Sequence, residues 1–550
     1  MITEYSLENF KAFAEEQNIK LRPITLIYGQ NSSGKSSILQ SLLLLKQTID
    51  HSENPQTLVL PKGNLVDLGG VREFINAHDV NKKFSFRITF AVDQSINKLS
   101  STFSKALRKM KIEKVGLNVQ MGYDEKNSSA RLEQIQVYID NTELPVYCFK
   151  IQKIGGQSDV CYDQDFAENT ENQLNRTNIE YGLCVCPIDP KHPFWTTYWE
   201  VTNDRIKNDF LPRAIDFKKH FEKNLDELER GVKVGHKNRS DSIAHELEKL
   251  YILIKRYSSY SFFDFIREID EQNKDIIIDC KNYLPVKIIR RKKKPNREFI
   301  YDALGLGDSI ESTLSVEIAF LVSNIIEKNL NKMLYIGPLR DYPERYYIFS
   351  GNHSEQVGKT GRMVPDVLFK RVDLLNAVNE MLEDFGLGYE LKISSINDKE
   401  SELQDVFALR LFDKKTNIHA SILDVGFGIS QVLPIIVQSM LSREKTLIIE
   451  QPEIHLHPKL QADLGSLIAL CSKKPYSNQF IIETHSQHLM LRLQRLIRTG
   501  VLKHDDVSVV YVNRETNGSK CYELRLDAEG DFIDEWPNGF FEEGYREMFS

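Results

Sequence analysis

Short apolar stretches near the N-terminus predict the first elements of the fold. Residues 3–8, 18–22 and 24–28 have the apolar content and the short length of β-strands, with a turn between the first two. The next apolar residues recur at helical spacing, and they are Ile38, Leu39, Leu42, Leu43 and Leu45. A strand, a loop of small residues and a helix in this order are typical of an α/β sheet.

The pattern changes after about residue 80. Four segments alternate like strands of an antiparallel sheet, namely 84–92, 115–121, 131–139 and 145–153. The polar stretch 158–180 predicts a surface loop. From 203 to about 275 the apolar residues take helical spacing, which predicts a helical region.

After residue 330 the pattern again predicts mixed strands and helices. Helices are expected near 365–386 and hairpin strands near 389–422. Further apolar strands are expected in KMLYI, TLIIE, QFIIETH and VSVVYV.

The simplest organisation is one discontinuous α/β unit, residues 1–80 with 330–515, interrupted by an insertion over 81–329. The insertion is expected to contain a β-rich part, a helical part and a basic segment, at 81–200, 201–280 and 287–297. We expect the acidic residues 516–550 to pack on the α/β unit.

Composition narrows the class of protein. A net charge of −7 over 550 residues gives no general attraction to nucleic acid or anionic lipid, so any such contact must be a local patch. No apolar run reaches the ~18 residues of a membrane span, and the N-terminal residues do not resemble a secretory signal. The seven cysteines are scattered, as expected of reduced thiols, so we expect a cytoplasmic protein without a membrane partner.

A phosphate-binding motif follows the strand at 24–28. The segment GQNSSGKS, residues 29–36, fits G-x-x-x-x-G-K-[ST] between a strand and a helix. We expect Lys35 to reach the β- and γ-phosphates of ATP, and the Ser36 hydroxyl to bind Mg²⁺. The other ATP-binding residues expected in this segment are Asn31, Ser32, Ser33, Gly34 and Ser37. In the later VGKTG, His353 replaces the first glycine of the motif, so one nucleotide site per chain is predicted.

Residues of the C-terminal half are expected to complete this site. An apolar strand ends on Glu450, whose carboxylate is expected to hold Mg²⁺, and Glu453 follows shortly after. A second strand delivers His485, whose ring can donate a hydrogen bond to a γ-phosphate. In DVGFGISQVLPI, Gly426 and Gly428 open a helix whose N-terminal amides are expected to face a phosphate.

These motifs, in this order, resemble the ABC-type head ATPases of the SMC and recombination-repair class over about half of the chain. The resemblance implies an α/β fold, an ABC-type P-loop NTPase head with a mixed sheet and flanking helices, here interrupted by a large β-then-α insertion. It places Asn9 and Lys11 of the opening strand and turn at the nucleotide, and Gly426 to Ser430 in the signature loop. It also implies a homodimer in which each signature loop closes on the ATP of the other head.

Longer strings resemble the PtuA ATPases of Septu-type anti-phage systems. They are YIGPLRDYPERYY, GFGISQVLPI, IIEQPEIHLHPKLQADL, ETHSQHLMLRLQRLI and DFIDEWPNGFFEEGYREMF. This resemblance implies an ATPase that regulates a separate HNH-type nuclease, PtuB-like, and that has no nuclease activity of its own. Where such a system includes a retron, its reverse transcriptase and the RNA–DNA hybrid product are further partners.

Three positions depart from the usual ABC pattern, namely Glu450 in place of Asp, Gln451 in place of the catalytic Glu, and Gly426 in place of Ser, with Ser430 one turn later. An amide cannot accept a proton from water, although it can orient one. Two explanations stay open. Either Glu453 acts as the base with help from His485, or the nucleotide mainly clamps two heads together. We expect slow but real hydrolysis.

Basic residues are concentrated in one run and in one further string. Residues 287–297 contain seven cations, which form either a solvated face or a contact with a nucleic-acid backbone. Arg340 and Arg345 are candidates for pairing with a phosphate or an acid across a head interface. The candidates for nucleic-acid contact in the run are Arg290, Arg291, Lys292, Lys293, Lys294 and Arg297.

Two other functions compete with a regulatory ATPase of a defence complex. The main alternative is a DNA repair or recombination ATPase of the SMC-like class. A self-contained nuclease is disfavoured, because the 65 residues after His485 are too few for a nuclease domain.

Overall fold

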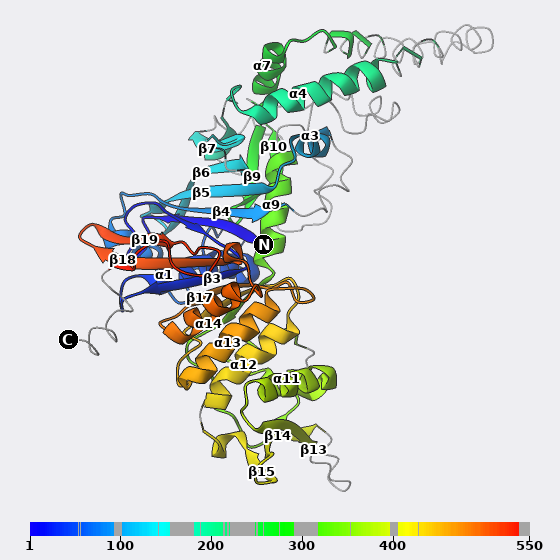
Figure 1. Cartoon of the computed structure of the whole chain (residues 1–550). Coiled ribbons are helices and arrows are strands. Elements are labelled where there is room, and N and C mark those ends of the chain that lie inside the picture. Colours follow the sequence, from blue (N-terminus) through cyan, green and yellow to red (C-terminus); the bar gives the residue numbers. More distant parts are fainter. Residues whose placement is uncertain are drawn as a thin grey trace.

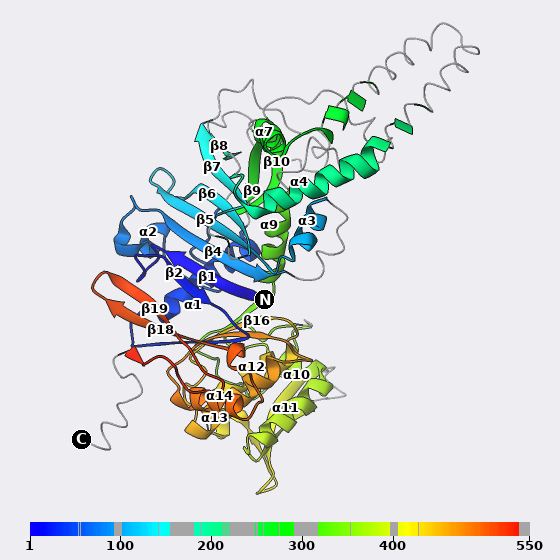
Figure 2. The same ribbon diagram turned by 45° about the horizontal axis from the view of Figure 1, so that its top comes forward.

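The computed structural model describes most of residues 1–537. The residues outside this description are 53, 55–56, 93–101, 141, 143, 154–180, 187–188, 213–214, 217–218, 220–247, 249–250, 253, 257, 274–275, 291–316, 352–353, 396–404, 427 and 538–550. Figures 1 and 2 show an elongated molecule in which two sheets lie next to each other and a helical lobe covers the far side of the smaller sheet.

The larger sheet has nine strands in the order β10-β9-β8-β7-β6-β5-β4-β1-β2, and every neighbouring pair is antiparallel. The strands are β1 Ile2–Glu8, β2 Gln17–Lys20, β4 Phe84–Ala91, β5 Lys114–Asp124, β6 Ser129–Ile139, β7 Tyr147–Lys153, β8 Tyr181–Val185, β9 Ile276–Lys281 and β10 Leu284–Arg290. The antiparallel strands predicted between residues 84 and 153 are confirmed. The two strands before residue 21 continue this sheet, so they do not lie beside the strand that follows them.

The smaller sheet has six strands in the order β11-β16-β17-β3-β18-β19. They are β3 Ile24–Gly29, β11 Met333–Ile336, β16 Thr446–Glu450, β17 Gln479–Glu483, β18 Val507–Glu515 and β19 Gly518–Leu524. All neighbours are parallel except β18 and β19, so the sheet is mixed. Strand β3 comes from the N-terminus and lies between two strands from the C-terminal half, which joins the two ends of the chain in one sheet.

Two hydrophobic cores cover the two faces of this smaller sheet. On one face, Ile27, Ile448 and Ile481 pack with helix α1, Lys35–His51, and with the larger sheet. On the other face, residues such as Leu26 and Leu447 pack with the helical lobe. Side chains alternate between the two faces of a strand, and every residue of β3, β16 and β17 is buried, as is typical of parallel strands in α/β proteins. Helices α1 and α12 therefore lie on opposite faces of the sheet, as Figure 1 shows.

The helical lobe is formed by α10 Val364–Lys370, α11 Val372–Asp384, α12 Gly428–Leu441, α13 Pro458–Cys471 and α14 Gln487–Arg498. A small sheet of β12 Tyr347–Ile348, β13 Tyr389–Ser395, β14 Val406–Asp413 and β15 Ile418–Ser421 extends it. The predicted helices near 365–386 and strands near 389–422 are confirmed. The other helical elements are α2 Val71–Phe74, η1 Asn76–His78, α3 Thr102–Met110, α4 Pro193–Arg205, η5 Ile206–Phe210, α7 Phe262–Asn273, α9 Glu317–Leu330, η6 Ile422–Asp424 and η7 His504–Asp506.

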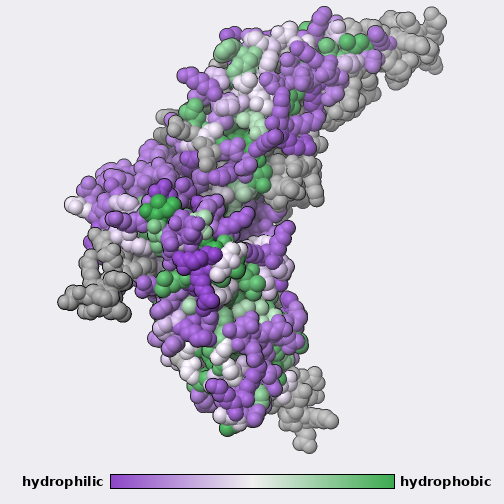
Figure 3. Space-filling model, in the orientation of Figure 1, coloured by the Kyte–Doolittle hydropathy of each residue, from purple (hydrophilic) through white to green (hydrophobic). Residues whose placement is uncertain are grey.

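The last described residues pack on the smaller sheet. The ring of Trp536 meets the ring of Tyr28 edge-on, with centroids 5.5 Å apart, and that of Tyr511 at 6.0 Å. No helix in the described part of the chain has both the length and the apolarity needed to cross a bilayer. The face seen in Figure 3 is mostly hydrophilic, with hydrophobic residues in small separate groups.

Candidate nucleotide-binding site

The loop between β3 and α1 has a backbone that only glycine accommodates at two positions. Gly29 and Gly34 have φ values of 148° and 104°, in the region that side chains disfavour. A Cβ on Gly29 would lie 2.3 Å from the carbonyl oxygen of Val512, and one on Gly34 would lie 2.9 Å from Cβ of Ala12. The tight turn predicted from the motif is therefore fixed by sterics on both sides.

Lys35 lies inside this loop. Its side chain is buried, and Nζ donates hydrogen bonds to the carbonyl oxygens of Gly29 at 3.0 Å and Gln30 at 2.8 Å. Burial lowers the pKa of Lys35, and the charges of Glu483 and Glu453 raise it in part. The ammonium group is thus held where the loop would surround a phosphate.

Two glutamates end neighbouring parallel strands next to the loop. Glu450 of β16 and Glu483 of β17 are register partners, and both are buried. Burial and the nearby charge of Glu483 raise the pKa of Glu450 to about 7. The hydroxyl of Tyr335 donates a hydrogen bond to Oε1 of Glu450 at 2.9 Å. Glu483 was not recognised as a site residue from the sequence, although it is visible there as an acid at the end of an apolar strand.

Glu453 and His485 are brought together by direct hydrogen bonds. Oε1 of Glu453 accepts from the backbone N–H of His485 at 2.6 Å, and Oε2 accepts from the hydroxyl of Thr484 at 2.7 Å. Burial, and then the charge of Lys35, lower the pKa of His485. Gln451 has a φ of 44°, and its N–H donates to the carbonyl of Glu483 at 2.8 Å, so the chain turns sharply after β16.

Arg340 and Arg345 have partners within this chain. Arg340 is buried and donates to the carbonyl oxygens of Glu450, at 3.1 Å, and of Gln451. Burial lowers the pKa of Arg340 to about 10, against the opposing charge of Glu453. Arg345 makes two hydrogen bonds of 3.0 Å to the carboxylate of Asp424.

Of the two residues expected from the opening strand and turn, one lies near the site. Nζ of Lys11 donates to Gln40 of α1 at 2.6 Å, and its charge acts on Glu450. Nδ2 of Asn9 instead donates to the carbonyl of Lys83 at 3.1 Å, ahead of strand β4. The described hydrogen bonds therefore direct Lys11 towards α1 and direct Asn9 towards the larger sheet.

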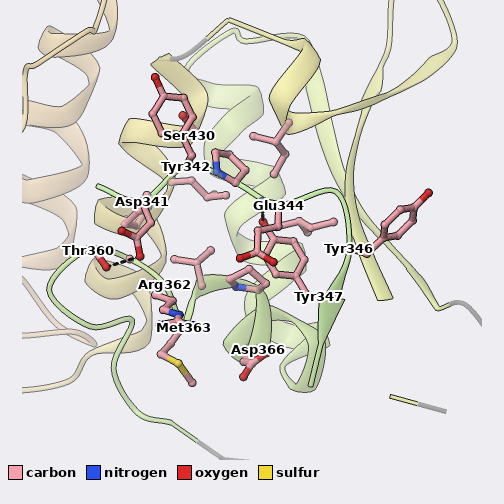
Figure 4. Close-up of a pocket in the computed structure, with 18 of the residues that line it drawn as sticks. Asp341, Tyr342, Glu344, Tyr346, Tyr347, Thr360, Arg362, Met363, Asp366 and Ser430 are labelled. Atoms are coloured by element: carbon pink, nitrogen blue, oxygen red, sulfur yellow. Dashed lines mark hydrogen bonds between the residues drawn. The ribbon is translucent and has the colours of Figure 1, made fainter. Parts of the chain in front are cut away.

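The glycine-opened helix begins where the sequence predicted, at Gly428. A Cβ on Gly428 would lie 3.3 Å from the carbonyl of His455, in the turn after β16. Ser430 is buried at one side of a pocket of about 880 Å³, drawn in Figure 4. Residues 341–350 form another side of this pocket, and no residue of the 29–37 loop lines it. Ser430 thus lines a pocket that is separate from the Lys35 loop of the same chain.

The basic run can be placed only at its start. Arg290 is the last residue of β10. The remaining candidates lie outside the described residues, and they are Arg291, Lys292, Lys293, Lys294 and Arg297.

The residues present fit Mg²⁺-bound ATP. Among the described residues, the buried Ser33 Oγ and one buried oxygen of Glu483 have no hydrogen-bond partner. A buried polar atom without a partner is costly, so a ligand that supplies one is favoured. Carboxylates and the Ser36 hydroxyl are the hard oxygen donors that Mg²⁺ prefers, and the loop amides with Lys35 suit a polyphosphate.

Comparison with protein families agrees with a site for ATP. A family model described as AAA ATPase domain matches residues 1–490. A second model, described as a protein of unknown function (DUF3696), matches residues 502–550. No curated protein matches the chain.

Solved SMC head domains match along most of the chain, but weakly. The SMC head domain from Thermotoga maritima is 8% identical, with a TM-score of 0.34, and the match covers 96% of this chain and 99% of that one. The Smc head domain derived from Pyrococcus furiosus, with an extended coiled coil and bound to the C-terminal domain of ScpA, is 12% identical, with a TM-score of 0.35 and coverages of 95% and 96%. The Smc head domain with a coiled coil and joint derived from Pyrococcus yayanosii is 10% identical, with a TM-score of 0.35 and coverages of 96% and 98%.

Proposed function

The chain belongs to the AAA ATPase domain family, and we propose that it binds and slowly hydrolyses Mg²⁺·ATP to hold two copies together. The phosphates lie in the 29–37 loop, where Lys35 is already buried. The Ser36 hydroxyl and the Glu450 carboxylate hold the metal ion, which neutralises phosphate charge when bound. His485 lies beside the loop as a donor towards the γ-phosphate.

One observation carries the two-copy arrangement. Helix α12, which Gly426 and Gly428 open, lies on the opposite face of the sheet from α1. A Cβ on Gly426 would meet no atom of the described residues within 4 Å, so the space beside this glycine, just ahead of the helix, is open. The N-terminal amides of such a helix suit an anion, and a second copy brings them the ATP held in its own loop. ATP then contacts both copies and favours their association.

Slow hydrolysis agrees with the residues that surround the attacking water. Gln451 offers an amide that orients water without accepting its proton. Glu453 is the nearest alternative base, and the hydrogen bonds from His485 and Thr484 fix its carboxylate. Gln451 thus orients the water and Glu453 accepts its proton, and substitutions at the two positions separate these roles.

The two-copy state, as we propose it, controls a separate HNH-type nuclease in cytoplasmic anti-phage defence, without nuclease activity in this chain. The five PtuA-like strings support this assignment, and three of them contain candidate site residues, namely GFGISQVLPI, IIEQPEIHLHPKLQADL and ETHSQHLMLRLQRLI. Where the gene cluster includes a retron, the reverse transcriptase and its RNA–DNA hybrid join the complex. The basic run at 287–297 then provides a nucleic-acid contact.

The test measures the mass of the purified protein in solution with and without ATP and Mg²⁺. We expect the measured mass to rise from that of one protomer to that of two when ATP and Mg²⁺ are added. Lys35→Ala should abolish this increase. Lys415→Ala, at an exposed lysine, is the matched control and should behave like the wild type. An ATP-independent mass, or one unchanged by Lys35→Ala, contradicts the proposal.

The defence role is tested in cells that carry the gene with its neighbours. We expect a nuclease to co-purify with the chain, and Lys35→Ala to remove protection against phage while leaving the protein abundant. ATPase activity stimulated by DNA ends, without a co-purifying nuclease, would favour a repair function instead.

A further inference from the structure

Glu483 occupies a position that the nucleotide site has not yet explained. It ends β17, between Glu450 of β16 and Ile27 of β3 in the sheet register. Two residues earlier in their strands, Ile481 and Ile448 belong to the core on the α1 face. Because side chains alternate along a strand, Glu483 and Glu450 both point to that same face.

The surroundings of Glu483 are those of a cation-binding carboxylate. It is 3% exposed, it is hydrogen-bonded to the side chain of Ser36, and the charge of Lys35 acts on it. Its Oε2 atom has no hydrogen-bond partner among the described residues. A buried carboxylate oxygen without a partner is expensive, and a metal ion is one of the few groups that compensates it.

We propose that Glu483 is the second carboxylate of the Mg²⁺ site, acting with Ser36 and Glu450. This inference rests on the proposed function, in which the loop binds Mg²⁺·ATP. Two carboxylates and a hydroxyl leave positions for phosphate oxygens and water in the octahedral shell of Mg²⁺.

A competing role for Glu483 is to neutralise Lys35. The two roles predict different dependence on metal. A metal-binding carboxylate strengthens nucleotide binding only when Mg²⁺ is present. Without Mg²⁺ its negative charge repels the phosphates. A carboxylate that serves only to position Lys35 matters equally with and without the metal.

The experiment measures binding of a fluorescent ATP analogue to the full chain during titration with Mg²⁺, and again in EDTA. For Glu483→Gln we expect the apparent Mg²⁺ affinity to fall roughly 10- to 100-fold, with analogue binding in EDTA unchanged or tighter. The isosteric amide keeps the shape of the buried side chain, and a thermal melt checks the fold. Glu444→Gln, at an exposed acid, is the control.

Each outcome decides a separate point. If Glu483→Gln titrates with Mg²⁺ like the wild type, or loses analogue binding equally in EDTA, the inference is wrong while the ATP site stands. If the wild type binds no analogue, or Lys35→Ala binds it normally, the proposed function itself fails. Should Glu483→Gln not fold, Glu483→Asp keeps the charge but withdraws it by one methylene, and the same loss of Mg²⁺ affinity is expected. In the double variant Glu483→Gln/Glu450→Gln, the loss of Mg²⁺ affinity should differ from the sum of the two single losses, because both carboxylates bind the same ion.

Discussion

Arg340 and Glu450 are joined by a hydrogen bond of 3.1 Å from Nη2 of the arginine to the backbone carbonyl of the glutamate. The arginine also donates to the carbonyl of Gln451, and it is 5% exposed. It therefore fixes the turn that carries Glu450, Gln451 and Glu453. The sequence made Arg340 a candidate for pairing with a phosphate or an acid across a head interface, and in the structure its hydrogen bonds go to the backbone of its own chain.

Replacing Arg340 should affect both stability and catalysis. Arg340→Ala removes the hydrogen bonds to the carbonyl oxygens of Glu450 and Gln451 and the positive charge near the buried Glu453, so we expect the free energy of unfolding to fall by about 3 kcal/mol. The turn then moves, and we expect kcat to fall by roughly tenfold or more. Urea unfolding and steady-state hydrolysis measure the two effects.

Arg345 provides the matched control for Arg340. Its side chain is 59% exposed, and its partner Asp424 is 51% exposed. An exposed ion pair contributes little, so Arg345→Ala should cost less than about 1 kcal/mol. Equal losses of stability in the two variants would contradict the positioning role of Arg340.

The buried carboxyl of Glu450 predicts a pH dependence of stability. Burial raises its pKa from 4.5 to about 7, so between these values the folded protein holds a proton that the unfolded chain has released. The free energy of unfolding must then fall as pH rises through this window. Glu450 is only 8% exposed, so the loss in the free energy of unfolding across this pH window is on the order of 3 kcal/mol.

The measurement compares wild type with Glu450→Gln in EDTA, without nucleotide, by urea unfolding from pH 5 to pH 8. We expect the variant to gain stability relative to the wild type as pH rises, because the amide has no proton to lose. Glu444→Gln, at an exposed acid, should follow the wild type. If the free energy of unfolding of Glu450→Gln changes with pH in parallel with that of the wild type, the raised pKa of Glu450 is contradicted.

Features of the site that depend on residues close together in the chain can be predicted from the sequence, and features that depend on distant residues cannot. The loop from Gly29 to Ser36 and the strands around it were predictable, because each depends on residues close together in the chain. Glu483 and the placement of Arg340 were not, because they follow from sheet register between strands far apart in sequence. Likewise, only tertiary packing separates strand β2 from β3, its neighbour in the chain, into different sheets.

The aromatic contact of the tail predicts a stability effect. Trp536 meets the rings of Tyr28, Tyr511 and Phe532, whose centroids lie 5.0 to 6.0 Å away. Trp536→Ala should lower the free energy of unfolding by about 2 kcal/mol, because a partly buried indole and three ring contacts are lost. Phe263→Ala, at a ring that is 69% exposed, should change it far less. Equal effects would indicate that the tail does not stabilise the smaller sheet.

The choice between slow hydrolysis and a pure clamp depends on Gln451 and Glu453. Single-turnover hydrolysis with bound ATP isolates the chemical step. Gln451→Glu adds a base beside Glu450, and we expect the rate to rise by about tenfold or more. Glu453→Gln places an amide nitrogen against the donors from His485 or Thr484, so it loses both the base and one hydrogen bond, and we expect the rate to fall by a similar factor.

These two variants keep the 29–37 loop intact, so ATP binding should change little in either, which separates chemistry from affinity. If neither substitution alters the single-turnover rate while Lys35→Ala abolishes binding, no residue of the turn after β16 handles the attacking water. ATP would then act as a clamp whose release, and not its hydrolysis, ends the two-copy state. If only Glu453→Gln lowers the rate, Glu453 is the base, and Gln451 serves mainly to shape the turn, in keeping with its φ of 44°.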